Sequence, residues 1–489
     1  MRLPTVSDYT SAYRAGWLTP SKLMSAWKAA QRELQTELLA FISIQHEDID
    51  LQTMASEHRY AVVKEESQRD TPGPFGGVPI GIKDEIDVVG YATTLGVPFE
   101  ERSERKQVDA VCVDRLRKQG ATIVGKLNMH ELGLGSTGSN IHFGTARNPF
   151  DLRRVAGGSS SGTAVAVATG LCPFAIGADG GGSIRIPAGL CGVYGIKPTS
   201  GLVPETGIGP LNYSIGHIGP MASSVEDLKV ALAAIAGPDG LDPKTALAPR
   251  ESAFAEKCAA SDLRGLEKKR IGYDPKWMSF AEAPVMTRIE AAMKLLESFG
   301  CDLVPISLPE DDVIRPVAYS VLGTELVSSQ RRLFEKRGSE CSAEAQLYIQ
   351  MSSSILAVDY IHALRVRQQL ASAVESVFHD VDLILSPTCG QTAPLYVPEM
   401  GTTGLRDDVT LKQLTRYTFL ANMTGVPGIS IPVGLSAEDG MPVGLQLMAN
   451  HWDEATLLTA AQKIESQWPL KLARIRSRHV DVVNAIKSI

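Results

Sequence analysis

The stretch Gly177-Ala-Asp-Gly-Gly-Gly-Ser-Ile-Arg-Ile-Pro187 places three consecutive glycines directly before Ser183. Glycine has no Cβ, so the backbone N–H groups of such a loop can converge on one point, as an oxyanion hole requires. A buried strand predicted over residues 172–176 and the apolar residues after Ser183 would hold the loop rigidly. The pattern is typical of an acyl-transfer site with a serine nucleophile, and a flexible turn is the alternative interpretation.

Strand-like and helix-like segments alternate on both sides of this loop. The apolar pattern predicts strands at residues 79–83, 122–124, 172–176, 303–306, 383–385, 429–433 and 443–448. It predicts helices at residues 107–118, 162–169, 284–299 and 355–378, one after residue 223 and one from residue 453. The alternation indicates an α/β fold in which one mixed sheet is wrapped by helices.

Residues 1–70 differ in character from the rest of the chain. They are rich in Ala, Leu, Glu, Lys and Gln, with Pro4 and Pro20 at expected helix starts, and predict an N-terminal helical lead-in packed on the core. Residues 71–489 are expected to form a single domain, which includes a surface connection at residues 238–267.

The composition is that of an ordinary globular protein, with 44% hydrophobic and 21% charged residues in a chain of 489. A net charge of −7 and the lack of any run of five Lys or Arg argue against nucleic acid as a partner. The seven cysteines are scattered without a C-x-x-C pair, which disfavours a disulfide framework and a zinc knuckle. The N-terminus carries no signal-peptide h-region and no transmembrane segment, so a cytoplasmic protein is expected.

Two short patterns approach nucleotide-binding motifs without completing them. Residues 120–127 are nearly a phosphate-binding loop, but Leu127 stands where Ser or Thr would hold magnesium. Residues 133–138 fit G-x-G-x-x-G but lie inside a loop, whereas a dinucleotide site needs a strand before the motif and a helix after it. Nucleotide binding is therefore not expected.

Two other patterns approach hydrolase motifs. His130-Glu131 begins like a zinc-protease helix, but the second histidine is missing, so no metal site is predicted. Ser160 is central in a G-x-S-x-G pattern, yet the polar residues 151–154 before it do not suit the hydrophobic strand of a nucleophile elbow. An α/β-hydrolase remains the second interpretation.

Two further side chains could activate the serine. Lys83 ends the predicted strand at residues 79–83, and this apolar approach suits a partly buried lysine, although most lysines are solvated. Burial of a lysine disfavours the charged ammonium, so a neutral amine can serve as a base near neutral pH. Ser159, in the loop at residues 157–161, could bridge the amine and the nucleophile by hydrogen bonds. Spacing alone does not join these three residues.

Residues 76–226 resemble the amidase signature family. Gly77-Val-Pro-Ile-Gly-Ile-Lys83 is similar to its lysine strand, Gly157-Gly-Ser-Ser-Ser161 to its Gly/Ser-rich loop, and the stretch quoted first to its nucleophile loop. The resemblance continues in residues 191–199, 216–220, 422–430 and 442–446. It implies the amidase signature fold, a large, mixed, mostly parallel twisted sheet with helices on both faces, in which residues 270–489 complete the sheet.

The resemblance also implies a role for each site residue. Lys83 would be the base, Ser159 a proton shuttle that follows a cis peptide bond, and Ser183 the nucleophile. The oxyanion hole would be formed by the backbone amides of Gly180, Gly181, Gly182 and Ser183, with Ser160, Asp179 and Arg185 in support. This chemistry needs no metal or organic cofactor.

The substrate implied is a small-molecule linear carboxamide. Residues 128–133, 147–149 and 159–162 look closest to plant-type fatty acid amide hydrolases, so fatty acid amides or N-acylethanolamines are the first candidates, with Gly133 in the substrate pocket. Aryl, peptide or small aliphatic amides are the alternative. The glutamine-hydrolysing component of a tRNA amidotransferase is a further alternative, although residues 414–420 offer no acidic residue for the glutamine amino group. A homodimer is compatible with the sequence.

Overall fold

The computed structural model describes residues 2–62, 72–99, 103–259, 263–404 and 407–469. Its centre is an 11-stranded sheet in the order β1-β3-β2-β6-β8-β7-β12-β13-β11-β9-β10. The strands are β1 (Phe41–Ser43), β2 (Pro79–Lys83), β3 (Thr122–Leu127), β6 (Phe174–Ala178), β7 (Tyr194–Lys197), β8 (Ile218–Ala222), β9 (Arg270–Tyr273), β10 (Asp302–Pro305), β11 (Leu383–Pro387), β12 (Gly428–Leu435) and β13 (Pro442–Ala449). A separate pair is formed by β4 (Arg147–Asn148) and β5 (Asp151–Val155).

The sheet is mixed, as predicted, but parallel pairing is less extensive than expected. Parallel pairs join β3 to β2, β2 to β6, β11 to β9 and β9 to β10. The other six pairs of the sheet are antiparallel, and they join β1 to β3, β6 to β8, β8 to β7, β7 to β12, β12 to β13 and β13 to β11. The reason is local for β12 and β13, which follow each other after a short turn and therefore pair as a hairpin.

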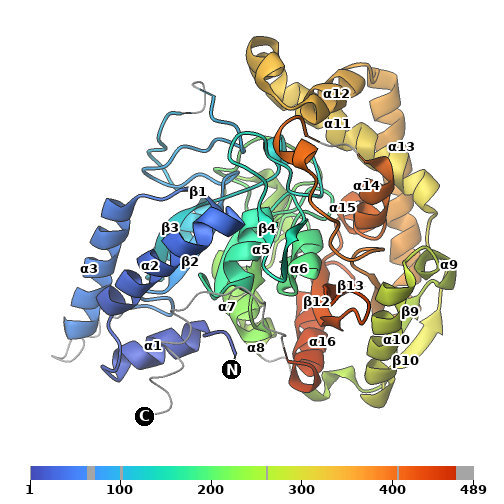
Figure 1. Cartoon of the computed structure of the whole chain (residues 1–489). Helices are drawn as coiled ribbons and strands as arrows, with labels where there is room; N and C mark the ends of the chain where they lie inside the picture. Colours follow the sequence, from blue (N-terminus) through green and yellow to red (C-terminus); the bar gives the residue numbers. More distant parts are fainter. Residues whose placement is uncertain (1, 63–71, 100–102, 260–262, 405–406, 470–489) are drawn as a thin grey trace.

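Helices cover both faces of the sheet (Figure 1). They are α1 (Val6–Arg14), α2 (Pro20–Leu38), α3 (His46–Val62), α4 (Val111–Lys118), α5 (Ser161–Ala168), α6 (Arg185–Cys191), α7 (Val225–Ile235), α8 (Glu251–Ala259), α9 (Pro275–Met278), α10 (Ala283–Ser298), α11 (Asp311–Arg337), α12 (Ala343–Ser353), α13 (Ala357–Val377), α14 (Asp408–Thr415), α15 (Phe419–Thr424) and α16 (Glu454–Gln467). Short 3₁₀ turns are η3 (Glu131–Gly133), η4 (Pro243–Leu247), η5 (Leu263–Leu266), η6 (Gly338–Glu340) and η7 (Pro398–Gly401).

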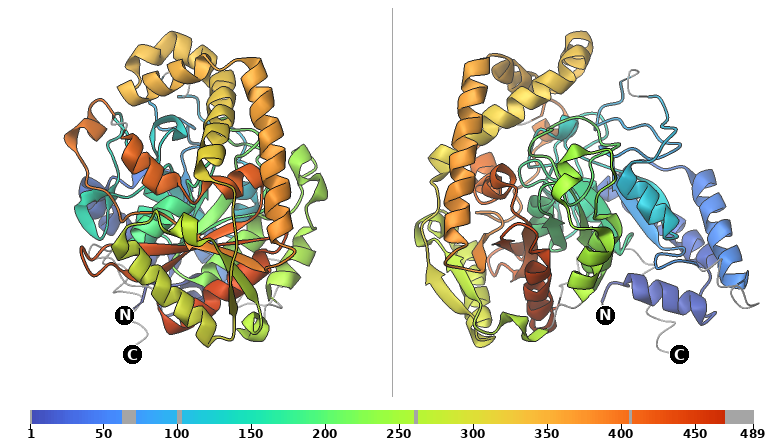
Figure 2. Two further views of the ribbon diagram at one scale, coloured as in Figure 1. Left: turned by 90° about the vertical axis from the view of Figure 1, so that its right-hand side faces the viewer. Right: turned by 180° about the vertical axis from the view of Figure 1, so that it is seen from behind.

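Separate hydrophobic cores lie on the two faces. On one face, α1, α4, α7, α10 and α16 share a core with the sheet. On the other, α2, α5 and α6 pack on the half that contains β2 and β6, while α11, α13 and α15 pack on the half that contains β11 and β13. Figure 2 shows α11, α12 and α13 standing together beside one end of the sheet.

The predicted helices and strands are confirmed with shifted ends, and several elements are additional. The predicted helix at residues 107–118 begins only at Val111, because the backbone N–H groups of Ala110 and Val111 donate outside the helix, to Asp87 O (2.9 Å) and Thr206 O (3.1 Å). Residues 238–267, expected as a surface connection, include α8, whose Phe254 packs into the core. The boundary proposed near residue 70 lies outside the described residues.

The strand period brings Lys83 to the face where the site forms. Ile80 and Ile82 belong to the core under α4 and α7, so Lys83, one residue further, points to the opposite face, where α5 lies. Because β2 and β6 are parallel neighbours, the residues after both strands meet at one edge of the sheet. This edge receives the glycine loop that follows β6.

Candidate active site

Lys83 is buried at the end of β2 and faces three hydrogen-bond acceptors. Its side chain is 1% exposed. The Nζ atom donates to Ser159 Oγ at 2.8 Å and lies 3.4 Å from the carbonyl oxygen of Ala178. The third acceptor is the Glu85 carboxylate, at 2.8 Å. The structure therefore joins Lys83 and Ser159 directly, which spacing in the sequence could not do.

Ser159 and Ser160 precede α5 in a tightly held loop. The Gly158–Ser159 peptide bond is cis, as the family resemblance implies. The Ser159 carbonyl accepts a hydrogen bond from His130 N at 3.0 Å. Ser160 Oγ donates to Ala178 O at 3.0 Å, and Ser160 N donates to Ser183 O at 3.2 Å. Ser160 thus ties the shuttle loop to the end of β6 and to the residue expected to act as nucleophile.

Ser183 lines a cavity together with Lys83 and Ser159, at the end of the glycine loop and just before α6. In the described part of the chain, the N–H groups of Gly180, Gly181 and Ser183 form no hydrogen bond with the protein. The Gly182 N–H, by contrast, donates to Asp179 Oδ1 at 2.6 Å. Three of the four amides expected in the oxyanion hole are therefore available to a ligand, and the Gly182 amide is already used.

Glycine is required at position 182 for steric reasons. Its φ of +123° is a conformation that side chains rarely adopt. A Cβ there would lie 2.4 Å from Thr418 Oγ1 and 2.7 Å from Ile186 Cδ1. The loop therefore cannot keep its shape with a larger residue at this position.

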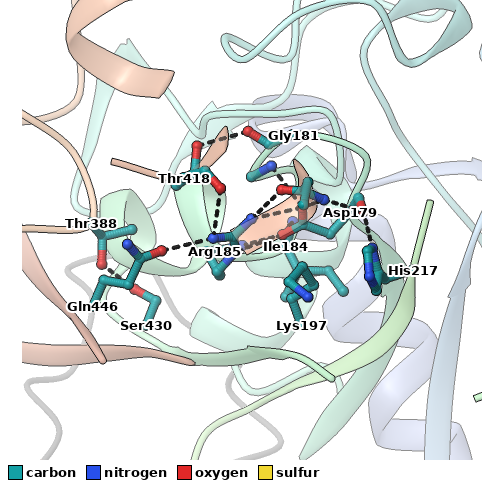
Figure 3. A network of polar contacts seen from close by, with 12 residues as sticks. Asp179, Gly181, Ile184, Arg185, Lys197, His217, Thr388, Thr418, Ser430 and Gln446 are labelled. Atoms are coloured by element: carbon teal, nitrogen blue, oxygen red, sulfur yellow. Dashed lines mark hydrogen bonds and ion pairs between the residues drawn. The ribbon is translucent and has the colours of Figure 1, made fainter. Parts of the chain in front are cut away.

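A buried ion pair supports the glycine loop from below (Figure 3). Asp179 and Arg185 are both fully buried and paired, with Arg185 Nε 3.0 Å from Asp179 Oδ2. The same carboxylate accepts from the N–H groups of Gly182 and Ile184. Burial alone would raise the pKa of Asp179, but the Arg185 guanidinium outweighs it and holds this pKa well below the ordinary value. Asp179 is therefore a fixed negative charge inside the loop.

Residues near the C-terminal end complete this support, and their roles are not evident from the sequence. Arg185 donates to the side chains of Asn422 (2.5 Å) and Gln446 (2.8 Å), as Figure 3 shows in part. Asn422 Nδ2 donates to both the carbonyl and carboxylate oxygens of Asp179. Thr418 Oγ1 donates to Gly181 O at 2.7 Å. Nothing in their spacing places these residues beside a loop more than two hundred positions earlier.

The cavity walls combine polar and apolar side chains that come from segments far apart in the sequence. Gly133, expected in the substrate pocket, lies in the wall of this cavity, and a Cβ there would lie 3.9 Å from Ser159 Oγ. The apolar lining residues are Leu132, Leu134, Ile186, Leu211, Tyr319, Leu322, Leu326, Tyr348, Leu411 and Phe419. The cavity measures about 70 Å³. A second cavity of about 550 Å³ adjoins it and shares Glu85, Gly180 and Leu211.

Histidines near the site are buried and uncharged. Burial lowers the pKa of His130 to about 4, an effect that Glu131 opposes and Lys83 reinforces. Burial likewise holds the pKa of His217 well below its usual value. Among the described residues, no three His, Cys, Asp or Glu side chains are grouped as metal ligands would be. In the same part of the chain, no helix is long and apolar enough to cross a bilayer.

Comparisons with known proteins place this site in a family. The family model described as Amidase matches residues 32–458. A fatty acid amide hydrolase of Arabidopsis thaliana is 34% identical over 471 residues, which cover 95% of this chain and 76% of the plant protein. A glutamyl-tRNA(Gln) amidotransferase subunit of Oleidesulfovibrio alaskensis is 36% identical over 430 residues, 81% of this chain and 85% of that protein. The crystal structure of a peptide amidase of Stenotrophomonas maltophilia superposes with a TM-score of 0.79 at 27% identity, covering 96% of this chain and 98% of the peptide amidase. The chain therefore belongs to the amidase family.

Proposed function

We propose that this protein hydrolyses a linear carboxamide through an acyl-enzyme on Ser183. The observation that carries the proposal is the hydrogen bond of 2.8 Å between the buried Lys83 amine and Ser159, in a cavity that Ser183 also lines. A serine hydroxyl is a weak nucleophile until a base removes its proton, and this arrangement offers a base with a relay.

Acylation would proceed by proton transfer along this relay. Ser159 takes the proton of Ser183 Oγ as it passes its own proton to Lys83, and Ser183 Oγ forms a bond to the carbonyl carbon. The proton returns along the same route to the leaving nitrogen, and the C–N bond breaks. Deacylation repeats the sequence with water as nucleophile and releases the carboxylic acid.

The oxyanion of the tetrahedral intermediate would be stabilised by backbone amides. The free N–H groups of Gly180, Gly181 and Ser183 are the candidates, since the Gly182 N–H is donated to Asp179. Such donors act without reorganisation when they are held in place beforehand. Asp179, Arg185 and Thr418 would supply that rigidity through their hydrogen bonds to the loop.

For the substrate, the cluster of apolar side chains in the cavity wall favours an amide with an apolar acyl group. Fatty acid amides and N-acylethanolamines are the first candidates, on the similarity to the plant hydrolase. The cavity volume of about 70 Å³ favours a second candidate, a short aliphatic or small aryl acyl group. A cavity that admits benzene measures roughly 150 Å³, so a long chain would have to extend beyond this volume, and the adjoining cavity of about 550 Å³ offers space for it.

A role inside an amidotransferase complex is a further alternative, because a glutamyl-tRNA(Gln) amidotransferase component is also similar to this chain. Residues 414–420 carry no acidic side chain for a glutamine amino group. We therefore expect the isolated chain to be active without ATP or partner proteins.

The test uses a series of amides with one amine and acetyl, hexanoyl, palmitoyl or benzoyl acyl groups, plus free glutamine. We expect hydrolysis of at least one acyl amide by the isolated protein, with none by Ser183→Ala. Acyl preference then separates the two substrate candidates. Glutamine hydrolysis that exceeds hydrolysis of every acyl amide would contradict the proposal.

A further inference from the structure

Glu85 contacts the lysine of the site, and neither motif spacing nor the family resemblance indicates it. Its carboxylate lies 2.8 Å from Lys83 Nζ, and its side chain is only 11% exposed. Hydrogen bonds and an ion pair fix Glu85 and the residue before it. Glu85 O accepts from Gly209 N at 2.7 Å, and the preceding Asp84 accepts from Gly96 N and pairs with Lys126. The position of the Glu85 carboxylate is therefore built into the fold.

The hydrogen-bond acceptors around Lys83 can accommodate both the charged and the neutral form of its amine, as a base requires. A charged ammonium has three N–H donors, and Nζ faces three acceptors, on Glu85, Ala178 and Ser159. A neutral amine keeps two N–H donors and gains a lone pair. If Glu85 and Ala178 O accept these two N–H groups, the lone pair is directed at the Ser159 hydroxyl, which is the orientation that proton transfer requires.

The geometry points to Glu85 as a positioning residue that orients the Lys83 amine and sets the pH above which the enzyme is active. The inference rests on the proposed function, since it assigns Glu85 its role through Lys83 as base. A carboxylate at this distance favours the ammonium over the neutral amine. The fall of activity on the acidic side of the pH profile should therefore occur at a higher pH in the wild type than in a variant that lacks the Glu85 charge.

Other titratable groups lie near Lys83 and Glu85, and their effects on the pH profile must be distinguished from the effect of Glu85. His130 approaches Lys83 from the loop after β3 but is neutral above about pH 4. Glu344 on α12 lines the same cavity and lies 3.6 Å from His130. Glu205 borders the second cavity and pairs with Lys244 at 2.5 Å. Burial, opposed by Lys244 and reinforced by Asp242 and Glu85, raises the pKa of Glu205 to about 7, so its titration overlaps the working range.

Three substitutions separate charge from position. Glu85→Gln keeps an oxygen acceptor but removes the charge, so we expect the acidic limb of kcat/KM to move to lower pH by about one unit or more. Glu85→Asp keeps the charge on a shorter side chain, so the limb should stay and kcat should fall. Glu85→Leu removes both, so the limb should move and kcat should fall about tenfold or more. Glu205→Gln is the matched control, a nearby carboxylate that does not contact Lys83, and should leave the limb within a few tenths of a unit.

The profile is measured with one hydrolysed amide across pH 5 to 10, with fluorophosphonate labelling of Ser183 in the wild type as a reference. An acidic limb of Glu85→Gln that coincides with the wild type would overturn the inference. An equal shift of the acidic limb in Glu205→Gln would also overturn the inference, because a carboxylate of the second cavity would then affect the pH profile as much as Glu85 does. Failure of the wild type to label at Ser183 would instead refute the proposed function itself.

Discussion

At the residue scale, the site depends on charges held out of water. Asp179 and Arg185 are each fully buried, and each satisfies the other together with neutral amides. A buried ion pair of this kind contributes less to stability than its Coulomb energy suggests, but removal of one partner leaves the other uncompensated. The pair is therefore best understood as the device that fixes the glycine loop.

Asp179→Asn should lower the free energy of unfolding by about 3–5 kcal/mol, because Arg185 would remain buried without a counter-charge. Chemical denaturation of variant and wild type measures this. Asp114→Asn is the matched control, since the side chains of Asp114 and its partner Lys118 are both exposed and the loss of this pair should matter little. An equal effect of the two substitutions would show that the buried pair has no special role.

Gly182→Ala should reduce kcat by about 100-fold or more, because a Cβ would collide with Thr418 Oγ1 and displace the oxyanion donors. Gly240→Ala is the control. Gly240 also has a positive φ, of +77°, but a Cβ there meets nothing within 4 Å. Steady-state rates with the best amide substrate measure both. Activity of Gly182→Ala close to that of Gly240→Ala would show that this contact does not shape the site.

At the element scale, the segments nearest the motifs can be predicted from the sequence and the walls of the cavity cannot. The period-2 pattern of β2 and the apolar run of β6 are recognisable because both strands lie inside the sheet. The 27-residue helix α11 is not recognisable, since Pro316 and scattered charges obscure its periodicity. Its Tyr319 and Leu322 nevertheless form part of the wall of the cavity. Such contacts arise from chain topology, which local patterns do not encode.

The same limit explains which site residues the sequence reveals. Lys83, Ser159 and Ser183 stand in recognisable motifs. Asn422 and Gln446 lie in stretches that also resemble the family, but only the fold shows that their side chains contact Arg185. Glu85 escapes prediction for another reason. An acidic residue two positions after a lysine is common, and only the coordinates show that both side chains turn to the same point.

Tyr348→Ala on α12 should raise kcat/KM for longer acyl chains relative to acetyl, because the truncation enlarges the cavity. The adjacent Leu347 is the matched control, since it is 44% exposed and absent from the cavity wall. Competition between acetyl and hexanoyl amides measures the ratio. A ratio unchanged in Tyr348→Ala, or changed equally in Leu347→Ala, would argue against α12 as a specificity element.

At the scale of the whole molecule, the N-terminal helices are part of the fold. Val6 and Tyr9 on α1 belong to the same core as the sheet and α7, and Val6 N donates to the Asp227 carboxylate at 3.0 Å. Burial, opposed by hydrogen bonds from Val6 and Ser224, raises the pKa of Asp227 to about 7. The burial of Asp227 therefore links the stability of the molecule to pH.

The sign follows from proton counting. The unfolded Asp227 loses its proton near pH 4, whereas the folded one keeps it to about pH 7, so this residue lowers stability as pH rises through that window. Asp227→Asn removes the titration. Its stability relative to the wild type should therefore rise between about pH 4 and pH 7, by up to about 4 kcal/mol. Denaturation at pH 5 and pH 8 measures this, and a constant difference would rule out the linkage.

One serine, activated by a buried amine through a second serine, is the proposed source of all the chemistry of this molecule. The decisive experiment is fluorophosphonate labelling, with the modified residue located by mass spectrometry. We expect one label, on Ser183, with labelling slowed about 100-fold or more in Ser159→Ala and Lys83→Ala proteins that remain folded. A label on another residue, or unslowed labelling of Ser183 in both variants, would refute this mechanism.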